Sequence, residues 1–113
     1  MEKQEIFQFP DLVVDTARHE VLVKERPVEL TVKEFELLCF LIRNNGIVFD
    51  RDRLLRSVWG KLRGHKSRTI DVHIRRIRKK LAESSHYLLT LRGVGYKFKA
   101  NGTTEFAEKG GDK

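Results

Sequence analysis

The side chains best suited to a chemical role lie between Ser67 and Glu83, where basic residues alternate with apolar ones. An apolar stripe recurs there every three or four residues, at Ile70, Ile74, Ile77 and Leu81. This spacing predicts one amphipathic helix over residues 67–83. The opposite helix face carries Arg68, Thr69, Val72, Arg75, Arg76 and Lys79. Such a face can contact phosphates and base edges from within a DNA major groove.

A row of charges that simply faces water is the plain alternative. Against it stands the lack of balancing acid, since Asp71 is the only carboxylate between Ser67 and Glu83. Asp71 precedes Arg75 by four residues, a spacing at which we expect the carboxylate to hold that guanidinium in place. The chain of 113 residues has a net charge of +7, and residues 51–80 hold 12 Lys and Arg against 2 Asp and Glu. The positive field belongs to this segment and indicates a polyanionic partner.

Residue types needed for other kinds of site are absent from the sequence or scattered along it. Cys39 is the single cysteine, which excludes a disulfide framework or a cysteine-rich zinc site within one chain, and its apolar neighbours predict a core position. The histidines outside residues 67–83 show no metal-ligand spacing, and no nucleophile motif or phosphate-binding loop is present. We therefore expect no enzyme activity, no metal and no cofactor.

Hydropathy gives no sign of a membrane segment. The longest apolar run, Leu37–Ile42, is too short to span a bilayer, and no apolar stretch follows Met1 as a signal peptide would require. A soluble, reducing, intracellular setting is therefore expected.

The elements that would position the basic helix begin with a sheet over residues 5–30. Phe7 and Phe9 alternate with polar neighbours, and Pro10 ends the run. Further extended segments are predicted at 12–14, 21–23 and 28–30, with turns at 15–18 and 25–27. The pattern indicates an antiparallel meander of three or four strands.

Two more helices are predicted before the basic one, which places three helices within residues 31–83. Thr31 and Glu34 have the spacing of a capping box, so the first helix begins there, and Asn45-Gly46 ends it. Its buried stripe is Phe35, Leu38, Leu41 and Ile42. Asp50 caps the second helix and Gly60 ends it. The inward side chains of this helix are expected to be Leu54, Leu55, Val58 and Trp59.

A β-hairpin over residues 87–100 follows the third helix. Its strands are predicted at 87–92 and 96–100, and glycines between them permit the positive φ of a tight turn. Residues 61–66 form a basic loop, and residues 101–113 are expected to be a disordered tail. The predicted fold is α+β, a winged helix-turn-helix with an N-terminal antiparallel sheet, a three-helix core and a C-terminal hairpin as its wing.

Five sequence motifs follow one another at fixed spacing. They are L-T-x-x-E-F-x-L-L at 30–38, G-x-V at 46–48, R-D-x-L-L-x-x-V-W-G at 51–60, S-R-T-I-D-V-H-I-R-R-I-R-K-K-L at 67–81 and T-L-R-G-V-G-Y-K-F at 90–98. Over residues 5–100 the chain thereby resembles the C-terminal effector domain of the OmpR/PhoB family of response regulators. The resemblance implies a two-component transcription regulator that binds specific double-stranded DNA, in the bacterial cytoplasm and on the nucleoid.

The resemblance also implies a role for individual side chains. Residues 67–83 would be the recognition helix, with Thr69, Val72 and Arg76 facing bases. Arg92, at the hairpin tip, would enter the minor groove, and a guanidinium on a narrow tip suits the negative potential of an A·T-rich groove. Phosphate contacts are implied for Arg51, Trp59, Arg68, His73, Arg75, Arg78, Lys79, Thr90 and Tyr96.

Three of these residues have a second interpretation. Trp59 could cover the core, and its one N–H could serve a phosphate at the same time. Val72 could be neutral filler instead of a contact to a thymine methyl group. His73 could be an ordinary exposed histidine.

The resemblance implies partners beyond one duplex. Direct-repeat sites would be bound by two domains head to tail, and the loop at 61–66 would touch RNA polymerase or, equally, DNA phosphates. The family's receiver domain has no room in this chain, which is expected to be an excised effector domain or a receiver-less member. The alternative function is a winged-helix protein-interaction module that docks RNA polymerase or a receiver domain. The charge excess of residues 51–80 argues against that alternative. RNA binding is disfavoured because a rigid helix does not fit the deep A-form groove.

Overall fold

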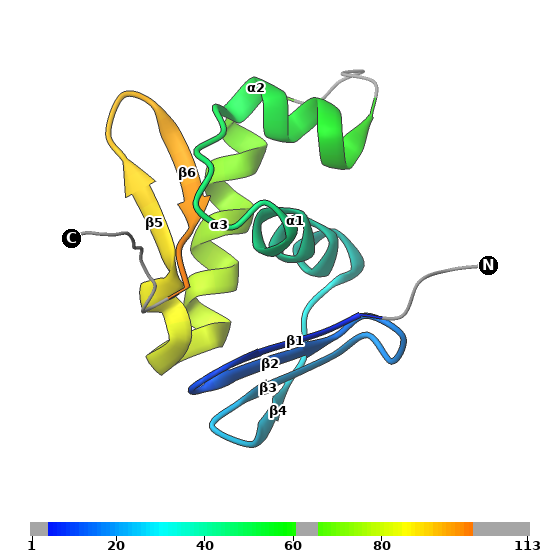
Figure 1. Cartoon of the computed structure of the whole chain (residues 1–113). Coiled ribbons are helices and arrows are strands. Elements are labelled where there is room, and N and C mark those ends of the chain that lie inside the picture. The colour runs from blue at the N-terminus through cyan, green and yellow to red at the C-terminus, as the bar shows by residue number, and fades with distance from the viewer. Residues whose placement is uncertain (1–4, 61–65, 101–113) are drawn as a thin grey trace.

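The computed structural model describes residues 5–60 and 66–100, and it confirms the predicted winged helix-turn-helix (Figure 1). A four-stranded sheet lies at one end, three helices follow, and a hairpin lies beside the third helix. The expectations for the loop at 61–65 and for the tail at 101–113 lie outside the described residues.

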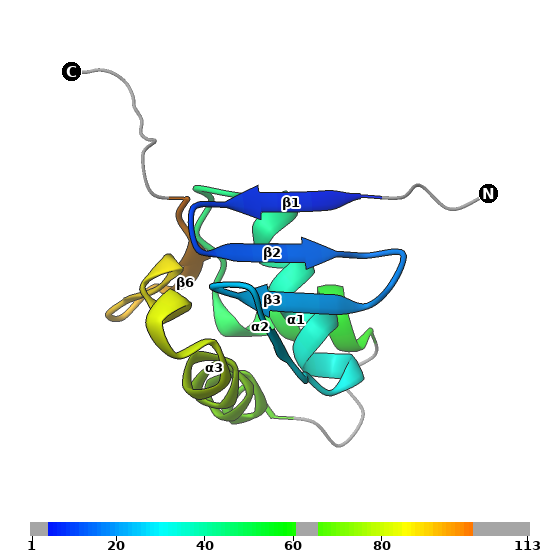
Figure 2. The same cartoon turned by 90° about the horizontal axis from the view of Figure 1, so that it is seen from below.

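The N-terminal sheet consists of β1 (Ile6–Phe9), β2 (Leu12–Asp15), β3 (Glu20–Val23) and β4 (Arg26–Val28). The strands are antiparallel and lie in sequence order, so each is joined to its neighbour by a short turn (Figure 2). One face of the sheet is buried through Leu12, Val14, Val21 and Val23.

The turn before β4 differs from the prediction of a turn at residues 25–27. Lys24 and Glu25 have φ values of 47° and 70°, so these two residues alone make the connection. A two-residue turn with positive φ matches the twist of the strands that it joins. Arg26 and Pro27 therefore belong to β4, which ends at Val28 and does not reach residue 30.

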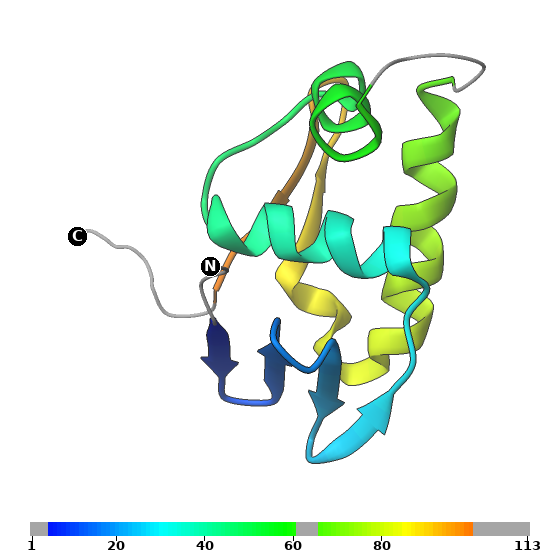
Figure 3. The same ribbon diagram turned by 90° about the vertical axis from the view of Figure 1, so that its right-hand side faces the viewer.

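Helix α1 (Val32–Arg43) begins as the capping box predicts. The Thr31 side-chain oxygen accepts from the Glu34 backbone N–H at 3.2 Å, and the Glu34 carboxylate accepts from the Thr31 N–H at 2.9 Å. The helix crosses the middle of the domain, with the sheet beneath it and the third helix along one side (Figure 3). It is buried on more than the predicted stripe, because Glu34, Leu37 and Cys39 are buried as well.

The second helix was expected to be a single α-helix, but it has two parts. Asp50 caps α2 (Arg51–Leu54), which continues as the π-helical turn η1 (Leu55–Trp59) up to Gly60. Leu54 and Leu55 are fully buried, whereas Val58 and Trp59 are only partly covered. A π turn changes the angle per residue, so the inward stripe does not continue to the end of the helix.

The third helix, α3 (Arg68–Leu81), ends two residues before the predicted boundary. Ala82 has φ 50°, which stops the helix, and the 3₁₀ turn η2 (Ala82–Tyr87) follows. The hairpin then consists of β5 (Leu88–Leu91) and β6 (Gly95–Phe98), so Tyr87 lies in η2 and not in a strand.

The hairpin, called the wing below, is joined to the segment before α2. Phe49 and Tyr96 exchange backbone hydrogen bonds of 2.9 and 3.0 Å. This close approach requires glycine at position 95, because a Cβ there would lie 2.0 Å from the Phe49 carbonyl oxygen. The wing is thereby a fixed part of the fold.

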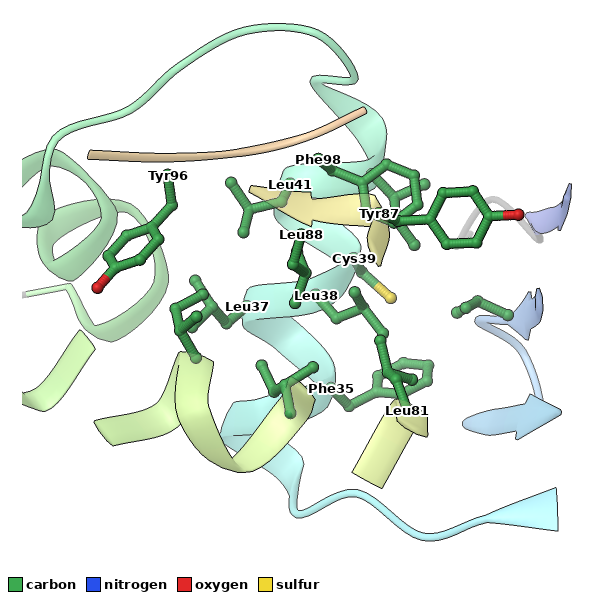
Figure 4. Close-up of a cluster of buried hydrophobic side chains, with 14 of the residues drawn as sticks. Phe35, Leu37, Leu38, Cys39, Leu41, Leu81, Tyr87, Leu88, Tyr96 and Phe98 are labelled. Atoms are coloured by element: carbon green, nitrogen blue, oxygen red, sulfur yellow. The ribbon is translucent and has the colours of Figure 1, made fainter. Parts of the chain in front are cut away.

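The hydrophobic core gathers side chains from all three helices, the sheet and the wing. Leu37, Leu38 and Leu41 of α1 lie at its centre, with Leu88 and Phe98 packed against them from the wing side (Figure 4). The predicted stripe of α3 is confirmed, since Ile70, Ile74, Ile77 and Leu81 are each at most 1 % exposed. The core therefore fixes which face of α3 points outward.

Candidate nucleic-acid interface

The outward face of α3 is defined here as Arg68, Thr69, Val72, Arg75, Arg76 and Lys79. Thr69 is half-buried and the other five side chains are exposed. Val72, at 39 % exposure, is an apolar side chain left open to solvent in the middle of this face. The helix thus presents mixed basic and apolar chemistry along its length, as recognition of phosphates and base edges requires.

Several cations elsewhere in the domain are paired with carboxylates. Arg26 pairs with Glu83 at 2.9 Å, and Lys80 pairs with the buried Glu34 at 2.7 Å. Burial raises the pKa of Glu34, but hydrogen bonds from Lys80 and Thr31 outweigh it, so the pKa lies below the ordinary value of 4.5. Lys80 therefore stabilises α1 against α3.

The exposed cations of α3 and of the wing tip, called the outward cations below, lack such partners among the described residues. Within residues 5–60 and 66–100, no ion pair or side-chain hydrogen bond occupies Arg68, Arg75, Arg76, Lys79 or Arg92. Four exposed cations without counter-charge along α3, with a fifth on the wing tip, create a strong local positive potential. Their unused donors are available to an external polyanion.

The expected pairing of Asp71 with Arg75 is wrong. Asp71 Oδ1 instead accepts from Arg51 Nε at 2.9 Å and from the hydroxyl of Tyr96. On the helix, Asp71 lies toward α2 and the wing, so tertiary partners reach it before the exposed Arg75 does. Arg75 is consequently left free of any carboxylate in the described part of the chain.

Arg78 ties α3 to the wing. Its guanidinium donates to the Leu88 carbonyl oxygen at 2.9 and 3.2 Å and to the Thr90 hydroxyl at 2.7 Å. It also lies 5.8 Å from the centre of the Tyr96 ring. The two predicted phosphate contacts Arg78 and Thr90 are thus brought together, and both are engaged in holding the wing.

Tyr96 is buried between α3 and the segment before α2, at 8 % exposure. Burial and the hydrogen bond to Asp71 raise the pKa of its phenol above the ordinary value of 10. Its single hydroxyl proton goes to Asp71, which places Tyr96 behind the surface and not on it.

Trp59, the last residue of η1, contacts side chains of both α1 and α3. Its ring meets His73 edge to face at 4.8 Å, and Lys33 Nζ lies 5.6 Å from its centre. His73 Nδ1 is 2.9 Å from the Thr69 carbonyl oxygen, which fixes the imidazole along the helix. Both rings are half-buried, so covering the core and offering a polar edge are compatible in each.

The wing tip carries Arg92 on a tight turn closed by a 2.8 Å hydrogen bond from Val94 N–H to the Leu91 carbonyl. Gly93 has φ 78°, which only glycine adopts without cost. Arg92 is exposed, and a groove of about 370 Å³ separates the tip from the start of α2 and from Ser67. The tip is therefore a tight, exposed turn that carries an arginine.

Sequence reasoning missed the partners of Asp71. A lone acid inside the basic helix was visible, but its true partners are 20 residues back, at Arg51, and 25 residues forward, at Tyr96. It also missed Arg53, whose guanidinium lies 5.1 Å from the centre of the Phe49 ring. No local pattern marks these contacts, because they depend on how the elements pack.

No group of three or more His, Cys, Asp or Glu side chains is placed to hold a metal ion in the described ranges. Among the described helices, none is long and apolar enough to cross a membrane. Burial raises the pKa of the Cys39 thiol to about 11, so that thiol stays protonated and unreactive.

Comparison with known proteins gives one family. The family described as "Transcriptional regulatory protein, C terminal" matches residues 25–98. The transcriptional regulatory protein SrrA of Staphylococcus aureus is 38 % identical over 109 residues, which cover 93 % of this chain and 45 % of SrrA. The chain therefore spans less than half the length of this curated relative.

Solved structures agree with the family. Response regulator DrrB, a Thermotoga maritima OmpR/PhoB homologue, superposes with a TM-score of 0.76 at 36 % identity, covering 84 % of this chain and 44 % of DrrB. The Klebsiella pneumoniae RstA DNA-binding domain, solved in complex with the RstA box, gives 0.74 at 32 % identity, covering 84 % of this chain and 97 % of that domain. The AdeR DNA-binding domain, solved with an intercistronic region, gives 0.71 at 29 % identity, covering 83 % and 99 %.

Proposed function

Because the chain belongs to the family of transcriptional regulatory protein C-terminal domains, of the OmpR/PhoB type, we propose that it binds double-stranded DNA in a sequence-specific manner. It would do so as the effector part of a two-component transcription regulator. The family is one of transcription regulators and not of enzymes. The observation that carries the proposal is the outward face of α3, whose cations have no counter-charge within the described residues.

In the proposed complex, α3 lies in the major groove. Its 14 residues give a rod of roughly 21 Å, at about 1.5 Å of rise per residue. Thr69, Val72 and Arg76 belong to the outward face and would reach base edges from it. Arg76 suits the guanine edge, and Val72 suits a thymine methyl group.

The phosphates on either side of the groove would be held by the remaining cations of α3 and by Arg51. Arg68, Arg75 and Lys79 are exposed on α3, and Arg51 is exposed at the start of α2. Each neutralised phosphate releases counterions, so these side chains would supply most of the affinity and its dependence on salt. The remaining predicted phosphate contacts would line or support the same surface; they are Trp59, His73, Arg78, Thr90 and Tyr96.

The wing would enter the adjacent minor groove with Arg92. The support for this is the shape of the tip, an exposed arginine on a tight turn that is joined firmly to the core. Minor grooves of A·T-rich DNA are narrow and strongly negative, which favours an inserted guanidinium.

We also propose larger assemblies, which the greater length of SrrA and DrrB supports. A single domain contacts few base pairs, so we propose that two copies bind direct repeats head to tail. Residues 61–66 would contact RNA polymerase. The whole regulator would include a receiver domain. It would act in the bacterial cytoplasm, on the nucleoid. RstA and AdeR, solved with DNA, support the duplex partner only.

Selection of duplexes from a randomised library, at two salt concentrations, tests the proposal. We expect one enriched motif of about six or seven base pairs per domain, retained at the higher salt because base contacts persist when counterion release weakens. A matched variant, Arg76→Ala, should enrich a shorter or more degenerate motif. Weak binding with no motif, lost at modest salt, would contradict the proposal and favour a protein-docking role.

A further inference from the structure

A single carboxylate oxygen joins three elements of the interface. Asp71 stands on α3, and its Oδ1 accepts from Arg51 Nε of α2 at 2.9 Å and from the Tyr96 hydroxyl of β6. The Asp71 side chain is 35 % exposed and that of Arg51 is 54 % exposed. The junction therefore lies at the edge of the surface that carries the outward cations.

The bond to Arg51 fixes a guanidinium that would otherwise move freely. It uses Nε, which leaves the terminal nitrogens of the fork for another acceptor. A long side chain loses rotamer entropy when it is immobilised, and holding it in place beforehand removes that cost from binding. Arg51 is thus ordered while still more than half exposed.

The bond to Tyr96 acts on the wing. The Tyr96 backbone pairs with Phe49, Arg78 lies over its ring, and its hydroxyl reaches Asp71. The position of β6 relative to α3 is therefore set near the wing tip, within a few residues of Arg92. A rotation of the wing would break the hydroxyl contact.

We infer that Asp71 is a positioning residue for DNA binding: it orients Arg51 toward a phosphate and fixes the wing against the recognition helix. The inference rests on the proposed function. Its distinctive feature is that a negative charge beside DNA strengthens binding. General electrostatics predicts the opposite, because removing an acid near a polyanion raises the attraction.

The two views predict opposite changes in DNA affinity when a carboxylate is removed, and two substitutions test them. Asp71→Ala and Asp52→Ala each raise the net charge from +7 to +8. Asp52 is exposed in the first turn of α2, next to Arg51, and belongs to none of these contacts, so it serves as the matched control. Binding of each variant to the selected duplex is followed by fluorescence anisotropy over a series of salt concentrations, with thermal unfolding as a check on the fold.

We expect Asp71→Ala to bind about tenfold more weakly, the size of a lost charge-assisted hydrogen bond, with a salt slope smaller by about one unit. Asp52→Ala should bind as tightly as the original chain or slightly tighter. Asp71→Asn keeps an acceptor oxygen and should restore part of the loss. In an Arg51→Ala background, Asp71→Ala should leave the salt slope unchanged.

A second variant separates the two arms of the junction. Tyr96→Phe keeps the ring and the Arg51–Asp71 pair but removes the hydroxyl. We expect an unchanged salt slope and a smaller preference for A·T-rich over G·C-rich flanks, since that preference depends on where Arg92 lies. The ratio of two affinities is insensitive to the fraction of folded protein, so a merely destabilised variant would not change it.

The outcomes distinguish the inference from the function beneath it. If the original chain binds its selected site and Asp71→Ala behaves like Asp52→Ala, the positioning role is overturned and the proposed function stands. If Tyr96→Phe retains the full flank preference, the wing arm is overturned. If the original chain shows no sequence preference, the proposed function falls and this inference falls with it.

Discussion

Replacing Gly95 by alanine tests how firmly the wing is built into the domain. The added Cβ would lie 2.0 Å from the carbonyl oxygen and 2.7 Å from the carbonyl carbon of Phe49. Both are backbone atoms, so no side chain can move aside. The two hydrogen bonds between Phe49 and Tyr96, at 2.9 and 3.0 Å, must therefore open.

The size of the effect follows from those bonds. A backbone hydrogen bond contributes roughly 0.5–1.5 kcal/mol net, and a buried group left unpaired costs about 1–3 kcal/mol. Phe49 and Tyr96 are 4 % and 8 % exposed, so water reaches the opened groups poorly. We expect Gly95→Ala to lower the free energy of unfolding by about 2–4 kcal/mol, and the Tm by more than about 10 °C.

The matched control is Gly93→Ala, in the same turn. Gly93 has φ 78° but nothing within 4 Å of its added Cβ, so only the left-handed conformation is penalised, by about 1–2 kcal/mol. Urea and thermal unfolding, followed by far-UV circular dichroism, measure both variants. A loss in Gly95→Ala no larger than that in Gly93→Ala would refute the claim that Phe49 anchors the wing.

Four further variants test the interface and its support. Arg76→Ala should relax base preference at one or two positions and cost about 1–3 kcal/mol, measured on single-base variants of the selected site. Arg68→Ala should weaken all sequences alike and reduce the salt slope by about one unit, and a sequence-selective loss would contradict that role. Arg92→Ala should lose most on A·T-rich flanks, and equal loss on G·C-rich flanks would exclude the minor groove. Glu34→Gln should make the free energy of unfolding fall less steeply as the pH is lowered. The pKa of Glu34 is lowered in the folded state, so its contribution to stability is present above pH 4.5 and is lost as the pH falls through that lowered pKa. Acid unfolding curves that coincide for the original chain and the variant would contradict a lowered pKa of Glu34 in the folded state.

Much of the fold was predictable because its signals are local. The stripe of α3 repeats at every expected position, and the capping box at Thr31 depends on residues three apart. Both patterns depend only on residues that are close together in the sequence, so each predicts its helix without knowledge of the packing. The glycine turn of the wing is a signal of the same kind.

The boundaries that were wrong depend on packing or on unusual φ. Lys24 and Glu25 adopt positive φ although neither is glycine, so the turn carries no marker in its composition. The π turn after Leu54 has no marker in the hydrophobic spacing, which predicts one regular α-helix there. Ala82 ends α3 with positive φ, although alanine favours helix.

The candidate interface also has a part that the sequence predicts and a part that depends on packing. The exposed cations of α3 follow directly from helical periodicity, since burial of one face fixes the other. The pairing of Asp71 did not follow, because the spacing to Arg75 competes with partners that only the folded chain brings near. Local ion pairs on a helix contribute only a few tenths of a kcal/mol, so a well-placed tertiary partner prevails.

A crystal structure of the chain bound to its selected duplex tests the central claim most directly. We predict that α3 lies in the major groove, with Arg76 within hydrogen-bonding distance of a base edge, and that Arg92 lies in the neighbouring minor groove. The Arg51 guanidinium should contact a phosphate while remaining paired with Asp71. A complex in which the outward face of α3 points away from the DNA, with the duplex held by another surface, would contradict the account.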